Sequence, residues 1–173
     1  GVDERAFATL AWNHPNSTIY LGQPFSESDL DPERVYAKKN TGMLTEGREA
    51  DNDLGQNTGQ NYKLIRYSDV LLMHAEAANE AGKQESEILE SINKVKARAN
   101  MPNISNGLSQ SDLRERIRKE RILELSLETD RFFDLKRWGV LVDRMNGNAD
   151  IPVVLCYWIW KIPVKLLGNM INL

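Results

Sequence analysis

The fold is decided by Glu120–Trp138, which reads ERILELSLETDRFFDLKRW. Opposite charges recur in it at helical spacing, because Glu128, Arg131, Asp134 and Arg137 follow one another at intervals of three residues. Residues three apart share one face of a helix, so each acid has an arginine beside it. Charges of this kind are costly to desolvate unless each has a partner. We therefore expect specifically packed helices held in register by an internal salt-bridge network.

The full predicted network contains seven charged residues. They are Glu120, Arg121, Glu124, Glu128, Arg131, Asp134 and Arg137. The same acids raise an alternative, because carboxylates with shifted pKa values also perform acid–base catalysis. A glycoside hydrolase would need two carboxylates facing a cleft at a separation of about 5–10 Å, whereas these carboxylates lie among arginines on packed helices. The pattern favours the structural role, since structural ion pairs also mimic active sites.

The composition is that of one globular domain. The chain has 173 residues, of which 41% are apolar and 27% are charged, and this length can bury a sizeable core. The net charge is −3 and no basic block occurs, so the sequence gives no support for nucleic-acid binding. His14, His74 and Cys156 do not form a cluster at metal-ligand spacing. We therefore predict neither a metal nor a cofactor.

Three zones follow one another along the chain. Residues 1–61 are rich in turn-forming residues, and their short apolar groups, such as 6–12 and 18–21, are interpreted as strands or extended pieces. Residues 62–145 are predicted to be helical. Residues 146–173 form a tail with the apolar run VVLCYWIWKIPVKLL. We expect this tail to pack on the helices, because an exposed run of this kind would favour aggregation.

Helical periodicity in the middle zone predicts four helices. The first covers residues 67–81 and stops at Gly82, and the second covers residues 86–99. The third begins at Ser109–Asp112, which matches a capping box, and the fourth covers residues 130–145. Short connections between consecutive helices predict two antiparallel hairpins, the unit of helical bundles and solenoids.

Three helical segments follow patterns that occur together in one family. Asn61–Ala77 is similar to RYADVLLMYAEA, Ile92–Ala99 to LNxVRxRA, and Glu120–Trp138 to ERRxELxxEGxRxFDLxRW. Weaker similarities at Asp3–Ala6 and Trp160–Pro163 keep the same order along the chain. Together these segments resemble the C-terminal portion of the SusD/RagB family, the nutrient-binding surface lipoproteins of Bacteroidetes outer membranes.

This resemblance implies a mainly α fold of tetratricopeptide-like helical hairpins with irregular and extended flanking segments. It also implies non-catalytic capture of a nutrient, a glycan or oligosaccharide, at the cell surface and its delivery to a SusC-like TonB-dependent transporter, as in polysaccharide utilisation. Family members are several hundred residues long, so we expect an N-terminal half to be a further partner. The family's lipidated cysteine is not matched, because Cys156 lies at the opposite end, so the outer-membrane lipid anchor is expected in that half.

Aromatic side chains outside the helices are the candidates for ligand binding. Sugar rings stack on aromatic faces while nearby polar groups hydrogen-bond the hydroxyls. The sequence therefore predicts a ligand-facing region in residues 1–61, with the candidates Trp12, Asn13, Tyr20 and Tyr36. Two alternatives stay open. Trp12 is part of the core, or the helical hairpins bind a protein or peptide partner through an exposed apolar groove and have no affinity for sugars.

Overall fold

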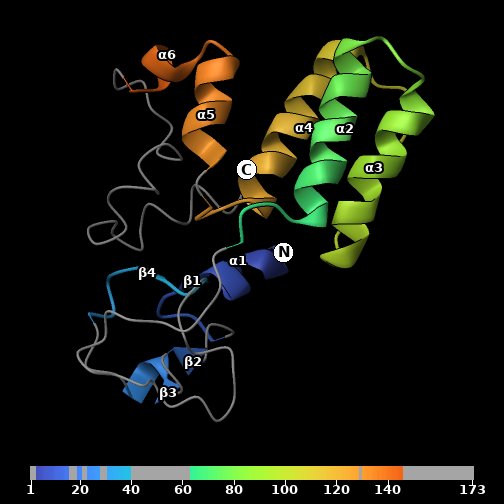
Figure 1. Cartoon of the computed structure of the whole chain (residues 1–173). Helices are drawn as coiled ribbons and strands as arrows, with labels where there is room; N and C mark the ends of the chain where they lie inside the picture. Colours follow the sequence, from blue (N-terminus) through green and yellow to red (C-terminus); the bar gives the residue numbers. More distant parts are fainter. Residues whose placement is uncertain are drawn as a thin grey trace. The chain divides into compact units, whose positions relative to one another are not determined.

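The computed structural model describes residues 3–15, 19–20, 23–27, 31–39, 63–128 and 130–145. The chain forms two compact units (Figure 1). We call Lys63–Asp134 the helical unit, and Gly1–Tyr62 together with Leu135–Leu173 the flanking unit. The described residues are mainly helical, so the predicted fold class is confirmed. The predicted tail, residues 146–173, lies outside the described residues.

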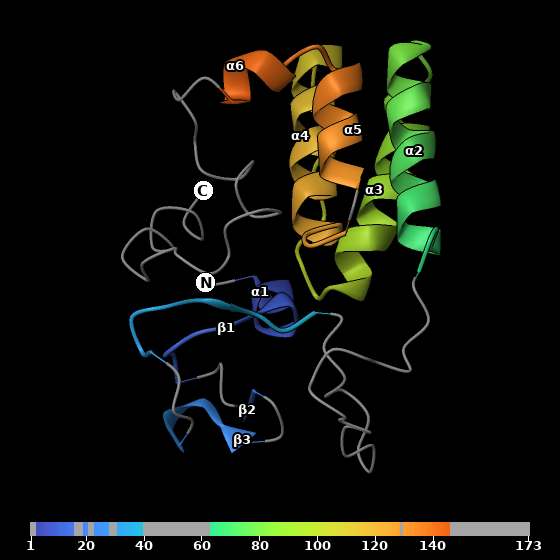
Figure 2. The same ribbon diagram turned by 60° about the vertical axis from the view of Figure 1, so that its left-hand side comes forward.

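Three long helices form the helical unit. They are α2 (Tyr67–Glu80), α3 (Glu85–Arg98) and α4 (Gln110–Glu124), and they lie side by side in Figures 1 and 2. Their bounds agree with the predicted ones to within a residue or two. The end of α2 meets the start of α4, because the Asn79 side chain donates to the Gln110 carbonyl (3.1 Å) and the Gln110 amide donates to the Asn79 carbonyl (2.6 Å).

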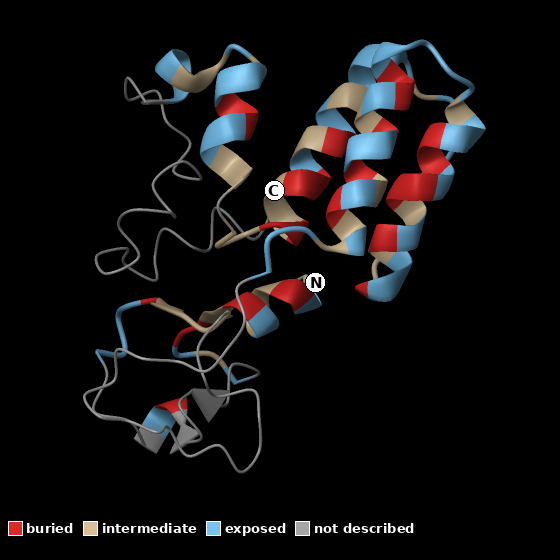
Figure 3. Ribbon diagram, viewed as in Figure 1, coloured by how far each residue is buried: buried red, intermediate tan, exposed pale blue. Residues whose placement is uncertain are grey.

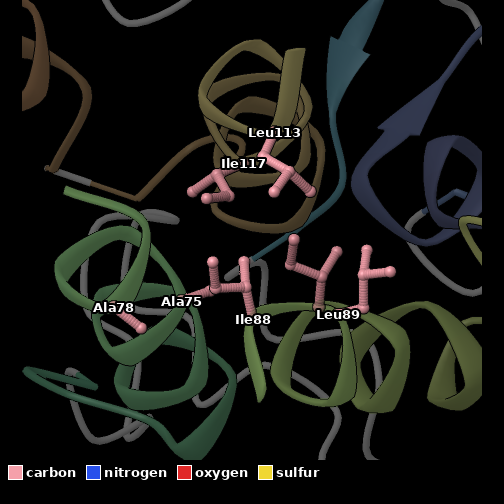
Figure 4. Close-up of a cluster of buried hydrophobic side chains, with 7 residues drawn as sticks. Ala75, Ala78, Ile88, Leu89, Leu113 and Ile117 are labelled. Atoms are coloured by element: carbon pink, nitrogen blue, oxygen red, sulfur yellow. The ribbon is translucent and has the colours of Figure 1, made fainter. Parts of the chain in front are cut away.

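An aliphatic cluster fills the space between these three helices. Its members are Ala75 and Ala78 of α2, Ile88, Leu89 and Ile92 of α3, and Leu113 and Ile117 of α4. In Figure 4 the labelled side chains from the three helices point toward one another. The spacing of three and four residues along each helix puts these side chains on one face, and Figure 3 shows buried residues alternating with exposed ones along the helices. This cluster is the hydrophobic core of the unit.

Side chains at the loop before α4 fix its path. Ser109 caps α4, since its hydroxyl accepts from the Asp112 backbone N–H at 3.1 Å and Asp112 accepts from the Ser109 N–H, which confirms the predicted capping box. The Glu85 carboxylate accepts from the backbone N–H groups of Gly107 (2.9 Å) and Leu108 (2.8 Å). Gly107 has a φ of 98°, which only glycine adopts without strain.

The predicted single helix over residues 130–145 is wrong, because the structure divides it. Helix α5 spans Asp130–Arg137 and α6 spans Leu141–Met145. The break falls at Gly139, whose φ of 72° is a left-handed conformation that ends a helix. The N–H of Val140 then donates to the carbonyl of Leu135, as in a helix-ending turn. The sequence analysis took Gly139 for a tolerated glycine within a helix.

The predicted strand over residues 6–12 is also wrong in its first part, which forms helix α1 (Glu4–Thr9). Asp3 caps this helix by accepting from the Arg5 backbone N–H at 3.0 Å. The Arg5 guanidinium also binds the same carboxylate, at 2.7 Å. This local cap outweighs the extended preference suggested by the apolar run.

Short strands make up the remainder of the described flanking unit. They are β1 (Leu10–Ala11), β2 (Ile19–Tyr20), β3 (Gln23–Pro24) and β4 (Tyr36–Ala37), with a 3-10 turn η1 (Phe25–Glu27) after β3. Strand β1 pairs antiparallel with β4, with Leu10 opposite Ala37 and Ala11 opposite Tyr36. Strand β2 pairs antiparallel with β3. Extended pieces separated by turns were predicted for this zone.

Ile117 is the most informative position for testing the core. It is fully buried, so Ile117→Ala removes three carbons from a packed site and should lower the free energy of unfolding by about 2–5 kcal/mol. Ile65→Ala, at a residue that is 70% exposed, should change it by less than about 0.5 kcal/mol. Urea denaturation of both variants measures the difference. Equal effects would show that the cluster is not the core.

Glu85 should make stability depend on pH. Hydrogen bonds from the backbone N–H groups of Leu108 and Gly107 hold the pKa of Glu85 below its ordinary value of 4.5. A lowered folded-state pKa contributes stability above the unfolded-state value, and this contribution is lost as pH falls through the folded-state pKa. Glu85→Gln should therefore melt below the parent at neutral pH, with a gap that closes progressively below pH 4.5. A gap that stays constant from neutral to acid pH would contradict this account.

Candidate ligand-binding site and buried ion network

Arg121 of α4 is the centre of a buried ion network in the helical unit. Its side chain is 5% exposed, with Nε 2.8 Å from Asp134 Oδ2 and Nη1 2.9 Å from Asp69 Oδ1. Burial alone would lower the pKa of Arg121, but the hydrogen bonds and charges of Asp134 and Asp69 outweigh it and raise the pKa. One guanidinium therefore links α4 to α2 and to the start of α5.

Arg66, the residue before α2, binds the other end of the same region. Its Nη2 donates to the backbone carbonyl of Glu124, its Nη1 binds the Glu124 carboxylate, and its Nε lies 3.0 Å from Glu128 Oε2. Burial lowers the pKa of Arg66, but its bonds to Glu128 and Glu124 outweigh burial and raise it. The last carbonyls of a helix have no partner within the helix, so Arg66 also caps the C-terminus of α4.

Two cations of α3 complete the network. Lys96 Nζ lies 3.8 Å from Glu120 Oε2, and Arg98 Nη1 lies 3.5 Å from Glu124 Oε1. Glu120 and Glu124 are only 4% and 3% exposed, so each buried carboxylate of α4 has a cation from a neighbouring helix. This is the condition under which buried charges are tolerated.

The network includes most of the predicted residues and adds partners that the sequence analysis did not identify. Glu120, Arg121, Glu124, Glu128 and Asp134 all make the ion pairs described above. Arg131 is half-buried on α5, and the Arg137 guanidinium lies over the Trp138 ring, 5.0 Å from its centre.

The missed partners are Arg66 and Asp69. A usable signal existed, because a charged residue in a helix as apolar as α2 needs a partner once it is buried. The partner itself could not be identified, since it lies more than fifty residues away in the sequence.

One cluster between α2 and α3 has the order of a catalytic triad. Ser91 Oγ lies 2.9 Å from His74 Nδ1, and His74 Nε2 lies 3.5 Å from Glu87 Oε1. A nucleophilic serine must reach its substrate, but Ser91 is 6% exposed. The cluster therefore fits a contact that joins α2 to α3. Among the described residues, no group of three or more His, Cys, Asp or Glu side chains is placed to hold a metal ion.

Trp12, the leading ligand candidate, lies directly after β1 and is 3% exposed. Its ring stacks on Phe7, with centroids 5.2 Å apart and 10° between the planes, and lies 5.4 Å from the ring of His14. Val35 belongs to the same buried cluster. A sugar can stack only on an accessible aromatic face. Trp12 therefore belongs to the small core of the flanking unit, which is the alternative that the sequence left open.

Asn13 and Tyr36 are brought to the same end of the β1–β4 pair, because Ala11 is opposite Tyr36. The Asn13 side chain is exposed. Tyr36 is half-buried, and its hydroxyl accepts from the backbone N–H of Asp31 at 3.0 Å. Its ring lies 5.9 Å from Phe25. Two candidates distant in the sequence are thus close together, with polar groups available for hydrogen bonds.

Tyr20 and His14 complete the comparison with the sequence. The backbone of Tyr20 lies in β2 opposite Gln23, and its side chain lies outside the described residues. His14 was not among the predicted site residues, although it lies beside Asn13. It is half-buried, and its ring contacts Phe7 and Trp12. A histidine adjacent to an exposed amide was the signal available for it.

The helical hairpins define the class of protein as a mainly α fold of tetratricopeptide-like type. The SusD family model matches residues 3–172, so the chain belongs to the SusD family, as the resemblance indicated. A crystal structure of a SusD superfamily protein from Bacteroides vulgatus is similar, with a TM-score of 0.72 and 26% identity over 96% of this chain and 38% of that chain.

Relatives in Formosa agariphila are similar over the same kind of span. SusD-like protein P2 is 40% identical over 90 residues, which are 48% of this chain and 18% of that protein. SusD-like protein P25 is 39% identical over 98 residues, which are 55% of this chain and 18% of that protein. The matched part is therefore less than two fifths of the length of each of these relatives.

Arg121 allows a direct test of the ion network. Arg121→Ala would leave Asp69 and Asp134 buried with one cation fewer, and should lower the free energy of unfolding by about 3–5 kcal/mol. Arg114→Ala is the matched control, because Arg114 lies on the same helix in an exposed pair with Glu80 and should change the melting temperature little. Chemical denaturation checks both. Indistinguishable curves for the two variants would refute the central role of Arg121.

Proposed function

We propose that the protein containing this chain captures a nutrient, most simply a glycan or oligosaccharide, at the bacterial surface and passes it to a SusC-like TonB-dependent transporter. The observation that carries the proposal is membership of the SusD family over nearly the whole chain. SusD family proteins serve glycan uptake in general at the outer membrane. Capture is by binding alone, and no bond is made or broken.

The three zones would have separate roles in this process. Residues 1–61 would face the ligand, residues 62–145 would be the helical scaffold, and residues 146–173 would pack on the helices. The N-terminal half of a longer SusD-type protein would complete the binding protein and provide a lipid anchor in the outer membrane. Among the described residues, no helix has the length and apolarity needed to cross a bilayer.

The ligand would meet the flanking unit at the end of the β1–β4 pair. The exposed amide of Asn13 can donate to and accept from sugar hydroxyls, and Tyr36 offers a half-exposed ring. Trp12 would support these residues from the core instead of stacking on the sugar, because its ring is covered by Phe7 and His14. Tyr20 stays a candidate on the strength of the sequence.

A second candidate function is that of a helical scaffold for a protein or peptide partner. The observation that favours it is a set of exposed apolar side chains on α2 and just before it. The two functions differ in a simple readout. A nutrient-binding protein has measurable affinity for oligosaccharides, whereas a scaffold has none and binds a polypeptide through its apolar surface.

The deciding experiment is a screen of the full-length protein against immobilised neutral, acidic and sulfated oligosaccharides, with calorimetry on any that bind. Repeating the calorimetry with the 173-residue chain tests whether these residues bind without the remainder of the protein. Co-purification with the outer-membrane transporter encoded beside it tests the delivery step. Absence of binding to every oligosaccharide, together with capture of a polypeptide, would favour the scaffold.

Asn13→Ala tests the position of the site. Losing one hydrogen-bonding amide should weaken oligosaccharide binding by about three- to tenfold, corresponding to about 0.5–1.5 kcal/mol. Asn103→Ala is the matched control, because Asn103 is an exposed amide in the loop before α4, outside the flanking unit. Calorimetric titration of the full-length variants gives both dissociation constants. Unchanged affinity in Asn13→Ala would move the site away from the β1–β4 pair.

A further inference from the structure

The outward side of α2 is apolar, unlike that of its neighbours. Five large hydrophobic residues are exposed on α2 and the residues before it: Leu64 (80%), Ile65 (70%), Tyr67 (70%), Val70 (45%) and Met73 (43%). Tyr67, Val70 and Met73 follow one another at intervals of three residues, so they lie along one side of the helix. We call Tyr67, Val70, Met73 and Ala77 the outer face of α2.

Charge is almost excluded from this face. The three acids of α2 are accounted for elsewhere: Asp69 is buried against Arg121, Glu76 is half-buried, and Glu80 pairs with Arg114 at the end of the helix. His74 is the one titratable residue beside the outer face, and it contacts Ser91 and Glu87 of α3. A helix that is apolar on all sides belongs in the interior of a larger structure.

The other two long helices show the contrast. The exposed positions of α3 and α4 are largely charged, namely Glu87, Glu90, Lys94 and Arg98 on α3 and Asp112, Glu115, Arg116 and Lys119 on α4. These helices have the polar outer surface of a protein in water. Helix α2 has its core side against α3 and α4, as Figure 4 shows, and a second apolar side with no comparable polar cover.

Repeat architecture indicates what covers such a face. In helical solenoids each hairpin packs only on its neighbours, and the terminal hairpin carries a polar outer face. The α2–α3 hairpin lacks that polar face, so it is not built as a terminal repeat. Ala77 and Ala81 lie four residues apart and have little side-chain bulk, which permits close approach of another helix. The solved SusD superfamily relative extends far beyond the matched region, since this chain covers 38% of it.

We propose that the outer face of α2 is the docking surface for a helical hairpin that precedes these residues in the longer protein. Helix α2 is the first long helix of the described chain, and the helices that follow it, α3 and α4, already occupy its core side. The occupant is an amphipathic helix whose apolar side meets Tyr67, Val70 and Met73. This inference does not depend on the identity of the nutrient.

Thiol labelling tests the proposal. Met73→Cys is introduced into a Cys156→Ser background, both in the longer protein and in the 173-residue chain, with Ser86→Cys as the matched control. Ser86 is an exposed residue on α3. The Met73→Cys thiol should react about tenfold more slowly in the longer protein than in the 173-residue chain, because a covered thiol reacts only through local opening. The Ser86→Cys thiol should react equally in both.

Three results would overturn the proposal. Equal Met73→Cys rates in both proteins would show that the longer chain leaves the face uncovered. Slow, concentration-independent labelling in the 173-residue chain would show that a segment of this chain covers it, and slow labelling that depends on concentration would indicate a second copy. Val70→Cys, measured in parallel, keeps the test valid if Met73→Cys fails to fold. Labelling needs no ligand, so its outcome is independent of the oligosaccharide screen.

Discussion

The described helical unit depends on the need of one buried cation for partners. Arg121 is 5% exposed, and its guanidinium reaches Asp69 before the second turn of α2 and Asp134 on α5. Such a group adds little net stability relative to an apolar core, but an arrangement that separates it from its acids leaves charges buried and unpaired. The aliphatic cluster of α2, α3 and α4 provides most of the driving force, while Arg121 discriminates between alternative ways of packing the same helices.

The two ends of the helical unit are fixed by different chemistry. At one end, Asn79 and Gln110 exchange hydrogen bonds between α2 and α4, and Glu85 holds the loop that leads into α4. At the other end, Arg66 caps α4 by binding the Glu124 carbonyl and carboxylate. Neutral and charge-assisted contacts thus define the register of α2 against α4 at both ends, and the apolar middle needs only to be filled.

Local signals in the sequence were sufficient for much of this fold. The limits of the three long helices, the Ser109 capping box and the face carrying Ile88, Ile92 and Val95 all depend on residues within one or two turns of each other. Features that depend on distant residues were not predicted. The partnership of Arg66 with Glu124 joins two helices through tertiary packing, and the burial of Trp12 depends on Phe7 and Val35 folding over it. The α5–α6 break needed the backbone conformation of Gly139, which composition does not reveal.

The three segments that reveal the family each provide one part of the ion network. Asn61–Ala77 carries Arg66 and Asp69, Ile92–Ala99 carries Lys96 and Arg98, and Glu120–Trp138 carries the acids and arginine between them. The family pattern is therefore largely the description of one buried polar arrangement, whose residues face each other inside the helical unit. A ligand does not contact residues that are buried in this way. For this reason the same sequence identifies the family clearly and leaves the nutrient unspecified, since ligand choice belongs to exposed residues such as Asn13 that local folding does not constrain.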